Sequence, residues 1–290
     1  MKVVGFSFIK NAEICDYPIR EAIQSILPLC DEVIVTVGKS NDNTLALVRD
    51  IHPRKIKIIE TIWDDNLREG GRVMAVETDK AFQAISEDAD WCFYIQADEI
   101  VHENSLNAIR ESMLKWKDDT RVEGLLLDFI HFYGSYNYVA DAYNWHRNEI
   151  RIIRNDKSIF SYKDSMGFRK QPNGKLQVKN SGGLIHHYTA VKSPEQMMNK
   201  TKAFTALFHS DEKLQEQFGN NTDYDFHKID SLKKFKGTHP ALMLERINRM
   251  NWNFEFDTSK SKMKLKYRIR KWIEQLTGKN IGEYKNYKLL

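Results

Sequence analysis

Apolar runs and amphipathic stretches alternate through the first hundred residues. Short runs rich in β-branched and aromatic residues have the pattern of strands buried on both faces, and they cover residues 2–9, 31–37, 55–63 and 91–99. Between them, apolar side chains recur at helical spacing in residues 17–27, 44–51 and 71–86. Strands that alternate with helices predict an α/β fold with a mostly parallel sheet covered by helices on both faces.

The later part of the chain changes character at Ser193. Before it, three further apolar runs predict strands at residues 122–134, 149–155 and 181–188. After it the spacing is helical, with Ser193 suited to cap a helix and Pro194 suited to its first position. No internal repeat or low-complexity linker interrupts the chain. We therefore expect one domain in residues 1–190, made of halves 1–110 and 111–190, and a helical extension in residues 191–290.

Composition places the chain among soluble globular enzymes. Hydrophobic residues make up 41% and aromatic residues 11% of its 290 residues. No apolar run approaches the roughly 20 residues needed to span a bilayer, and the first residues turn polar too soon for a signal peptide. We therefore expect a cytoplasmic protein. Its three cysteines are an odd number without paired spacing, which argues against a disulfide framework or a zinc site.

The net charge of +4 is unevenly distributed. From residue 260 onward there are ten Lys and Arg against two Asp and Glu, so the preceding residues sum to about −4. A mildly acidic body without a basic stripe argues against nucleic acid as a partner. Within the basic tail, one side of a predicted helix carries Leu265, Ile269, Trp272, Ile273 and Leu276. Such a helix could contact an anionic membrane at its inner face, or pack on its own domain, and both interpretations stay open.

The run at residues 91–99 ends on two adjacent acids, Asp98 and Glu99. Ligands of open α/β sheets bind at the carboxyl ends of the strands. A carboxylate at that edge suits a hard divalent cation that also binds a phosphate. The alternative is a strand that ends in a solvated acidic turn.

Four segments stand in a characteristic order, FSFIKNAE, VTVGKSNDNT and YIQADE after predicted strands and LIHHY later in the chain. Together they resemble the family 2 glycosyltransferases, enzymes of the GT-A fold that transfer a sugar from a nucleotide-sugar donor with inversion. The resemblance covers roughly residues 1–190. It implies that residues 1–110 bind the nucleotide-sugar, that residues 111–190 bind a glycan or lipid-linked acceptor, and that Mg²⁺ or Mn²⁺ assists. It further implies a hexosyltransferase of bacterial surface polysaccharide or lipopolysaccharide synthesis.

The resemblance also implies which residues contact the donor. In the family, the segment after the first strand approaches the nucleotide, which here gives Asn11 and Glu13. Ser40 and Asp42 match the motif after the second strand, whereas Val37 replaces an acid that often helps hold the base. These polar residues could instead only shape a loop and cap a helix.

Two arginines are the natural diphosphate contacts of the segment between the third and fourth strands. They are Arg68 and Arg72, whose planar guanidinium groups can each grip two phosphate oxygens. A solvated loop followed by a charged helix face is an equally good explanation of the same residues.

The segment Ile95 to Glu99 corresponds to the metal motif of the family. It keeps the second acid, Asp98, but has Gln96 at the first position, where an amide holds a ribose hydroxyl or a metal-bound water more weakly than a carboxylate. A further metal or phosphate contact is implied at His186 or His187. Neighbouring side chains of a strand point to opposite faces, so at most one of the two histidines can enter the site, and a structural histidine is the alternative.

An inverting transfer needs a base that takes the proton of the acceptor hydroxyl. Asp164 falls where the family carries this acid, although it could also be an ordinary turn residue, and Asp156 and Glu149 are weaker candidates. Aromatic residues crowd positions 131–149, where they could form an acceptor cleft or part of the core.

Two rival functions remain open. The substitutions at Val37 and Gln96 are compatible with a catalytically silent relative that binds a nucleotide-sugar or a glycan. A sugar-phosphate nucleotidyltransferase is less consistent with the sequence, because the segment after the first strand contains no glycine for a phosphate loop.

Overall fold

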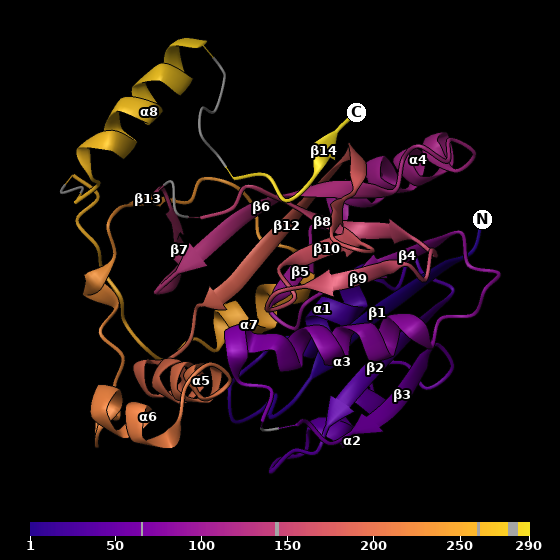
Figure 1. The fold of residues 1–290 in the computed structure, drawn as a ribbon. Helices are drawn as coiled ribbons and strands as arrows, with labels where there is room; N and C mark the ends of the chain where they lie inside the picture. Colours follow the sequence, from indigo (N-terminus) through magenta and orange to yellow (C-terminus); the bar gives the residue numbers. More distant parts are fainter. Residues whose placement is uncertain (65, 143–144, 260–261, 278–283) are drawn as a thin grey trace.

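The computed structural model describes residues 1–290 except 65, 143–144, 260–261 and 278–283. Parts of the aromatic segment 131–149 and of the basic tail therefore lie outside the described residues. The described part has a large mixed sheet with helices packed against it, so the α/β class predicted from the sequence is confirmed (Figure 1).

Four parallel strands form one half of the main sheet. Their spatial order is β3 (Ile56–Thr61), β2 (Glu32–Gly38), β1 (Val3–Ile9) and β4 (Trp91–Tyr94). The chain moves outward from β1 to β2 and β3 and then returns to place β4 on the other side of β1. The strand order thus reverses between β1 and β4, which is the topological switch point of the sheet.

The other half of the sheet is mixed rather than parallel. Strand β8 (Asn148–Arg154) runs antiparallel between β4 and β6 (Gly124–Tyr133), and β12 (Gln177–Ala190) runs parallel to β6. The strand predicted at residues 181–188 is therefore longer than expected. Beyond β6, β7 (Ser135–Ala140) lies between β6 and β13 (Leu232–Lys234), and two short strands, β5 (Glu99–Val101) and β14 (Lys288–Leu289), pair with β12. A separate small sheet contains β9 (Ile159–Tyr162), β10 (Gly167–Lys170) and β11 (Gly174–Lys175).

The helices predicted in the first half of the chain are present as α1 (Ile19–Ile26), α2 (Thr44–Arg49) and α3 (Arg72–Gln83), and α4 (Leu106–Trp116) is an addition. The last hundred residues contain α5 (Pro194–Ala206), α6 (Asp211–Phe218), α7 (Leu244–Asn248) and α8 (Leu265–Thr277). Helix α5 begins as predicted, with a capping box between Ser193 and Gln196. The expected helical extension also sends β13 and β14 back to the main sheet, which the sequence pattern does not indicate.

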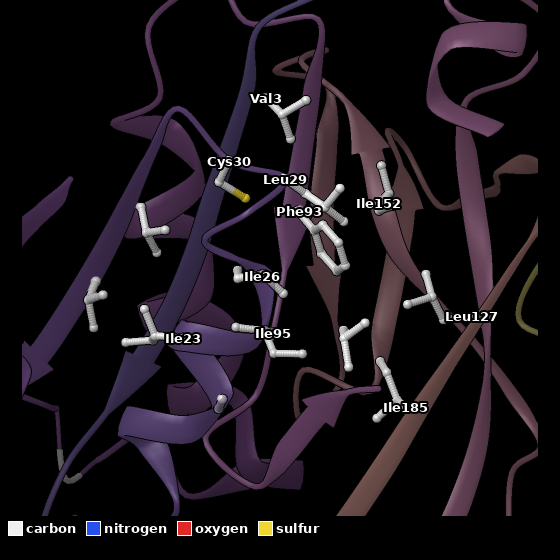
Figure 2. Packing of buried hydrophobic residues seen from close by; sticks show 14 of the residues in the cluster. Val3, Ile23, Ile26, Leu29, Cys30, Phe93, Ile95, Leu127, Ile152 and Ile185 are labelled. Atoms are coloured by element: carbon white, nitrogen blue, oxygen red, sulfur yellow. The ribbon is translucent and has the colours of Figure 1, made fainter. Parts of the chain in front are cut away.

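The parallel strands β1, β2 and β4 are buried on both faces, as their continuous apolar runs predict, whereas the edge strand β3 is only partly buried. In β1, Val3 points into a cluster that includes α1 and residues of α4, whereas Val4 and Phe6 point into a second cluster with α3. Figure 2 shows the first of these clusters, to which Ile23 and Ile26 of α1 and Phe93 of β4 all contribute. Because both faces are covered, the carboxyl ends of these strands are the edge at which they can offer polar groups to a ligand.

Candidate active site

A cavity of about 750 Å³ lies at the carboxyl ends of the parallel strands. Its walls come from the ends of β1 and β4, from the segment after β3, from β12 and from α5. It therefore occupies the switch point, where open α/β sheets bind their ligands. Six of the residues singled out in the sequence line it, namely Asn11, Arg68, Gln96, Asp98, Asp164 and His187.

Asp98 is a nearly buried carboxylate in the cavity wall, with 7% of its surface exposed. Its Oδ2 atom accepts a hydrogen bond of 2.9 Å from Nζ of Lys200, and its Oδ1 atom is 3.5 Å from Nε2 of His187. Burial alone would raise the pKa of Asp98, but the charges of Lys200 and His187 outweigh burial and hold the pKa well below its usual range. Asp98 is therefore an ionised group next to the cavity rather than a solvated turn residue.

Lys200 is a site residue that sequence reasoning missed. It lies on α5, and Nζ also donates hydrogen bonds to the backbone oxygen of Thr189, at 2.8 Å, and to Oγ1 of Thr189, at 2.6 Å. All three ammonium protons thus have acceptors. The ring of Tyr17 lies 5.0 Å from Nζ and adds a cation–π contact. In sequence, Lys200 is one of two lysines on α5, and only the contact of α5 with Thr189 of β12 and with Asp98 distinguishes it.

Glu99, the second of the adjacent acids, has a different partner. Its carboxylate binds Arg151 through two hydrogen bonds, 2.8 Å from Nε and 2.7 Å from Nη2, and the two side chains are 0% and 1% exposed. Arg151 further donates to the backbone oxygens of Ile150 and Met166. The fork geometry of this pair compensates for the burial of both charges. Asp98 and Glu99 therefore point to separate cations, one at the cavity wall and one in the interior.

Gln96 lines the cavity but is held by its neighbours. Its Nε2 atom donates to the backbone oxygen of Ser165, at 3.0 Å, and to the hydroxyl of Tyr94, at 3.3 Å. The backbone N–H of Gln96 donates to Glu99 Oε2 at 3.2 Å. The position that carries the first acid in the family motif is therefore neutral and oriented by hydrogen bonds.

The two adjacent histidines lie on opposite faces of β12. His187 lines the cavity, whereas His186 is buried among aromatic side chains, with its ring 5.2 Å from that of His102 and 5.2 Å from that of Phe132. Burial lowers the pKa of His186 to about 3, so its ring is neutral at physiological pH. The structure thus gives His186 a packing position away from the cavity, in contrast to the metal role considered from the sequence.

His131 and His146 join His187 in a cluster whose candidate ligand atoms lie within 4.8 Å of one another. Nε2 of His131 is 2.6 Å from the backbone oxygen of His146, which can only accept, so this nitrogen carries the proton. In its neutral form His131 then accepts a hydrogen bond at Nδ1 from Nδ1 of His187, 2.7 Å away. Burial lowers the pKa of His131 to about 3, which favours that neutral form. The contacts form a hydrogen-bonded chain that fixes the ring of His187, whose Nε2 atom faces Asp98.

The predicted nucleotide contacts after β1 and β2 mainly bind each other. Oδ2 of Asp42 accepts from the backbone N–H groups of Glu13 and Ile14, at 2.9 and 3.0 Å, and Oγ of Ser40 accepts from the N–H of Asn11 at 3.0 Å. Burial would raise the pKa of Asp42, but the hydrogen bonds it accepts lower the pKa below its usual value. Of the four predicted residues, Asn11 lines the cavity. The other three hold the two loops together.

The two arginines also separate. Arg68 lines the cavity, and its Nη1 atom donates to the backbone oxygen of His209 and to Oδ1 of Asp211, both at 2.9 Å. Arg72 is the first residue of α3, is exposed, and is outside the cavity lining. The structure therefore brings only Arg68 to the site.

Asp164 lines the cavity from the turn between β9 and β10. Its neighbours Lys163 and Ser165 adopt positive φ angles of 56° and 65°, which turn the chain sharply at this point. Burial raises the pKa of Asp164, and the hydrogen bond from its own backbone and the charge of Lys163 offset this only in part. Asp164 therefore combines access to the cavity with a raised proton affinity.

Trp63 is a second residue that sequence reasoning did not assign to the site. It follows β3, lines the cavity, and packs against the end of β2, where a Cβ atom on Gly38 would lie 2.4 Å from its Nε1. Phe8 and Lys10 also contact the ring, with centroid distances of 5.9 Å and 5.2 Å. The aromatic wall formed by Trp63 depends on a glycine at position 38.

The groups around Asp98 fit the predicted Mg²⁺ or Mn²⁺ poorly. Asp98 Oδ1 and His187 Nε2 lie 3.5 Å apart and could share an ion, but Gln96 offers a neutral amide where the family has a carboxylate, and His186 lies elsewhere. Magnesium in particular prefers several oxygen ligands. Lys200 already neutralises Asp98, so this wall has no net negative charge to attract a divalent cation.

No family model matches the chain, and no curated protein matches it. Among solved structures, TarS residues 1–349 from S. aureus is 13% identical with a TM-score of 0.40, and the match covers 71% of this chain and 65% of that chain. Glucosyl-3-phosphoglycerate synthase from Mycobacterium tuberculosis, in complex with Mn²⁺, UDP and phosphoglyceric acid, is 17% identical with a TM-score of 0.30, covering 45% and 43%. The mannosyltransferase PcManGT from Pyrobaculum calidifontis, in complex with GDP-Man and Mn²⁺, is 20% identical with a TM-score of 0.33, covering 43% and 34%. The chain thus spans less than two thirds of the length of each.

Proposed function

We propose that the protein is a GT-A glycosyltransferase related to family 2, which binds a nucleotide-sugar donor in the cavity at the switch point. The observation that carries the proposal is Asp98, an ionised carboxylate at the carboxyl end of β4, in a segment that resembles the metal motif of that family. The cavity of about 750 Å³ also has the size expected for such a ligand, since small-molecule sites usually measure about 300–1,000 Å³.

The donor would lie across the ends of the strands. Trp63 offers an aromatic face for the nucleobase, and Asn11 is near the end of β1, where the ribose would follow. Arg68 and Lys200 supply cations for the diphosphate from two sides of the cavity. The position of Val37, buried in the core at 3% exposure, means that the base would be held by stacking rather than by the acid common in the family.

The proposed reaction inverts the anomeric carbon. The acceptor hydroxyl oxygen forms a bond to that carbon as the bond to the diphosphate oxygen breaks, and the nucleoside diphosphate leaves with the electron pair. The hydroxyl proton passes to the carboxylate of Asp164, whose pKa is raised by burial and which is therefore a better base than an exposed aspartate. The choice of Asp164 as the base is supported by its place in the cavity lining, which Asp156 does not share. The Mg²⁺ or Mn²⁺ that the family resemblance implies stays a prediction, and no step of this reaction is assigned to it.

The test combines donor binding with turnover. Nucleotide-sugars that bind are found by their stabilising effect on thermal unfolding, and transfer or donor hydrolysis is then measured for wild type, Asp164→Asn and Asp156→Asn. We expect Asp164→Asn to bind the donor normally but to lose about 100-fold or more in turnover, whereas Asp156→Asn keeps both. Unchanged turnover in Asp164→Asn would remove it as the base. If no nucleotide-sugar binds wild type, the glycosyltransferase proposal is wrong.

A second candidate is a silent relative that binds the donor without transferring it. The observation in its favour is that two positions of the family motif are neutral, with Val37 in the core and Gln96 held by Ser165. Such a protein would be stabilised by a nucleotide-sugar and would show no hydrolysis or transfer with any acceptor. Turnover that depends on Asp164 excludes this alternative.

We also propose that α8 contacts an anionic membrane, which would suit a lipid-linked acceptor of bacterial polysaccharide or lipopolysaccharide synthesis at the inner face of the membrane. Leu265, Ile269, Trp272 and Leu276 form one stripe along the helix and are 69%, 50%, 62% and 65% exposed. Figure 1 shows α8 beyond the edge of the main sheet. Lysines and arginines flank the stripe, as in interfacial helices. Among the described residues no helix is both long and apolar enough to cross a bilayer.

Substitution tests this contact better than deletion of the tail, because Tyr287 is buried in the core and Asn286 binds Arg169. We expect Ile269→Asp with Trp272→Asp to abolish co-sedimentation with vesicles that contain anionic lipid. Leu244→Asp, at a position on α7 that is 51% exposed, is the matched control and should bind as wild type does. Equal binding by all three proteins would contradict the membrane role of α8.

A further inference from the structure

The charges at the end of β4 cancel in pairs. Glu99 is neutralised by Arg151 in the interior, and Asp98 is neutralised by Lys200 at the cavity wall. Mg²⁺ is bound mainly by carboxylates, phosphates and water, so a site for it needs carboxylate oxygens that face the ion. Here Asp98 reaches the cavity and already has Nζ of Lys200 2.9 Å away, and the other acid position of the motif is occupied by the neutral Gln96.

The lysine is built into the fold rather than resting on the surface. Lys200 and Asp98 are both 7% exposed, and the contact joins residues 102 positions apart, on α5 and at the end of β4. Thr189, on β12, accepts the other two protons of the ammonium group. An ion bound to Asp98 would stand within a few ångströms of this fixed positive charge and would be repelled by it.

We propose that the ammonium group of Lys200 binds the donor diphosphate directly, so that donor binding does not require a divalent cation. This inference rests on the proposed function, because it concerns the same cavity and the same ligand. Asp98 acts as a positioning residue, since its carboxylate holds the ammonium group at the cavity wall. A phosphate oxygen can replace the hydroxyl of Thr189 as the acceptor of one N–H of Lys200, and that hydroxyl can then rotate to donate its own proton to the phosphate.

His187 strengthens the same surface. Its Nδ1 atom is engaged by His131, and Nε2 faces Asp98 at 3.5 Å. His187 also lines the cavity, so its ring lies beside the ligand. Arg68 lines the cavity as well, and although it is paired with Asp211, its guanidinium has further N–H groups that can donate to a phosphate oxygen.

The first experiment measures the binding of UDP and of GDP to wild type by calorimetry, once with EDTA and once with MnCl₂. We expect the dissociation constant of the nucleotide that binds to differ by less than about threefold between the two conditions, well below the tenfold that corresponds to 1.4 kcal/mol. Binding in MnCl₂ alone would overturn the inference and leave the proposed function standing. No binding of either nucleotide in either condition would count against the proposed function itself.

The second experiment removes the charge. We expect Lys200→Met to weaken nucleotide binding in EDTA about thirtyfold or more, as truncation of a buried charge usually does. Lys202→Met, on the same helix but bound to the backbone oxygen of Asn221 at the surface, is the matched control and should bind as wild type does. Binding equal to wild type in Lys200→Met would overturn the inference.

A double variant separates a ligand contact from mere neutralisation of Asp98. Asp98→Asn with Lys200→Met removes both charges, so it avoids leaving a buried carboxylate unpaired and keeps the test open if the single variant does not fold. We expect the folded double variant, checked by circular dichroism, to bind the nucleotide as weakly as Lys200→Met. Binding restored to the wild-type value would show that Lys200 serves only to balance Asp98, and the inference would fall.

Discussion

The buried pair of Glu99 and Arg151 allows a quantitative prediction about stability. Both side chains are at most 1% exposed, and two short hydrogen bonds join them. In Arg151→Met the new side chain fills much of the same space, but the carboxylate of Glu99 loses its charge partner and keeps only the N–H of Gln96. Removal of one partner from a buried pair costs about 3–5 kcal/mol. Since domains are typically stable by about 5–15 kcal/mol, the variant should be close to unfolding.

The assay is urea unfolding followed by tryptophan fluorescence for wild type, Arg151→Met, Glu99→Gln and the double variant. We expect each single variant to lose several kcal/mol and the double variant to lose less than the sum, with a coupling energy of about 2 kcal/mol or more. A cost below about 1 kcal/mol for Arg151→Met, or costs that simply add, would refute the claim that this pair compensates for its own burial.

Two further predictions concern the pH dependence of stability and a tight turn. His131 and His186 have pKa values near 3 in the folded protein, whereas an unfolded histidine has a pKa of about 6.5. The unfolded chain therefore binds more protons than the folded one between these values. The free energy of unfolding thus falls as the pH drops from 7 to 5, by about 2 kcal/mol for each histidine. Burial raises the pKa of Asp79 to about 6, so protonation of Asp79 increases the free energy of unfolding by roughly 1.3 kcal/mol between pH 7 and pH 5. Together the three groups predict a net loss of stability of about 3 kcal/mol. Urea midpoints measured at pH 7 and pH 5 check this, and equal midpoints would contradict it. Gly134→Ala should cost about 2 kcal/mol or more in the same assay, because Gly134 has a φ of 72° and a Cβ there would lie 2.4 Å from the ring of Phe254; an unchanged midpoint would show that the ring can move away.

Several elements were predictable because their signal is local. The strands β1 to β4 are visible in the sequence as apolar runs, because strands of a parallel sheet covered by helices carry mostly apolar side chains. The helices between them are visible as apolar residues at helical spacing, because each helix buries one face. The start of α5 was readable from Ser193 and Pro194, since capping depends on neighbouring residues. The small sheet of β9 to β11 and the returning strands β13 and β14 were not foreseen. They are short, with two to four residues each, and their pairing depends on distant partners.

The candidate site was predictable only in part, for the same reason. Asp98 and Asp164 could be singled out because they stand in segments that resemble a family and follow predicted strands. The structure brings both to the cavity lining, together with Asn11, Arg68, Gln96 and His187. It directs Glu13, Ser40 and Asp42 into contacts between loops, and it places Arg72 and His186 away from the cavity.

The sequence alone determined the alternation of strands and helices, the position of the carboxylates at the end of β4 and the basic tail, because burial periodicity, strand ends and charge are properties of neighbouring residues. Only the tertiary structure decided that Asp98 would meet Lys200, 102 positions away, and that Glu99 would meet Arg151, 52 positions away. Such contacts follow from how α5 and β8 pack against β4 and β12, and that packing minimises the free energy of the whole chain rather than of any segment.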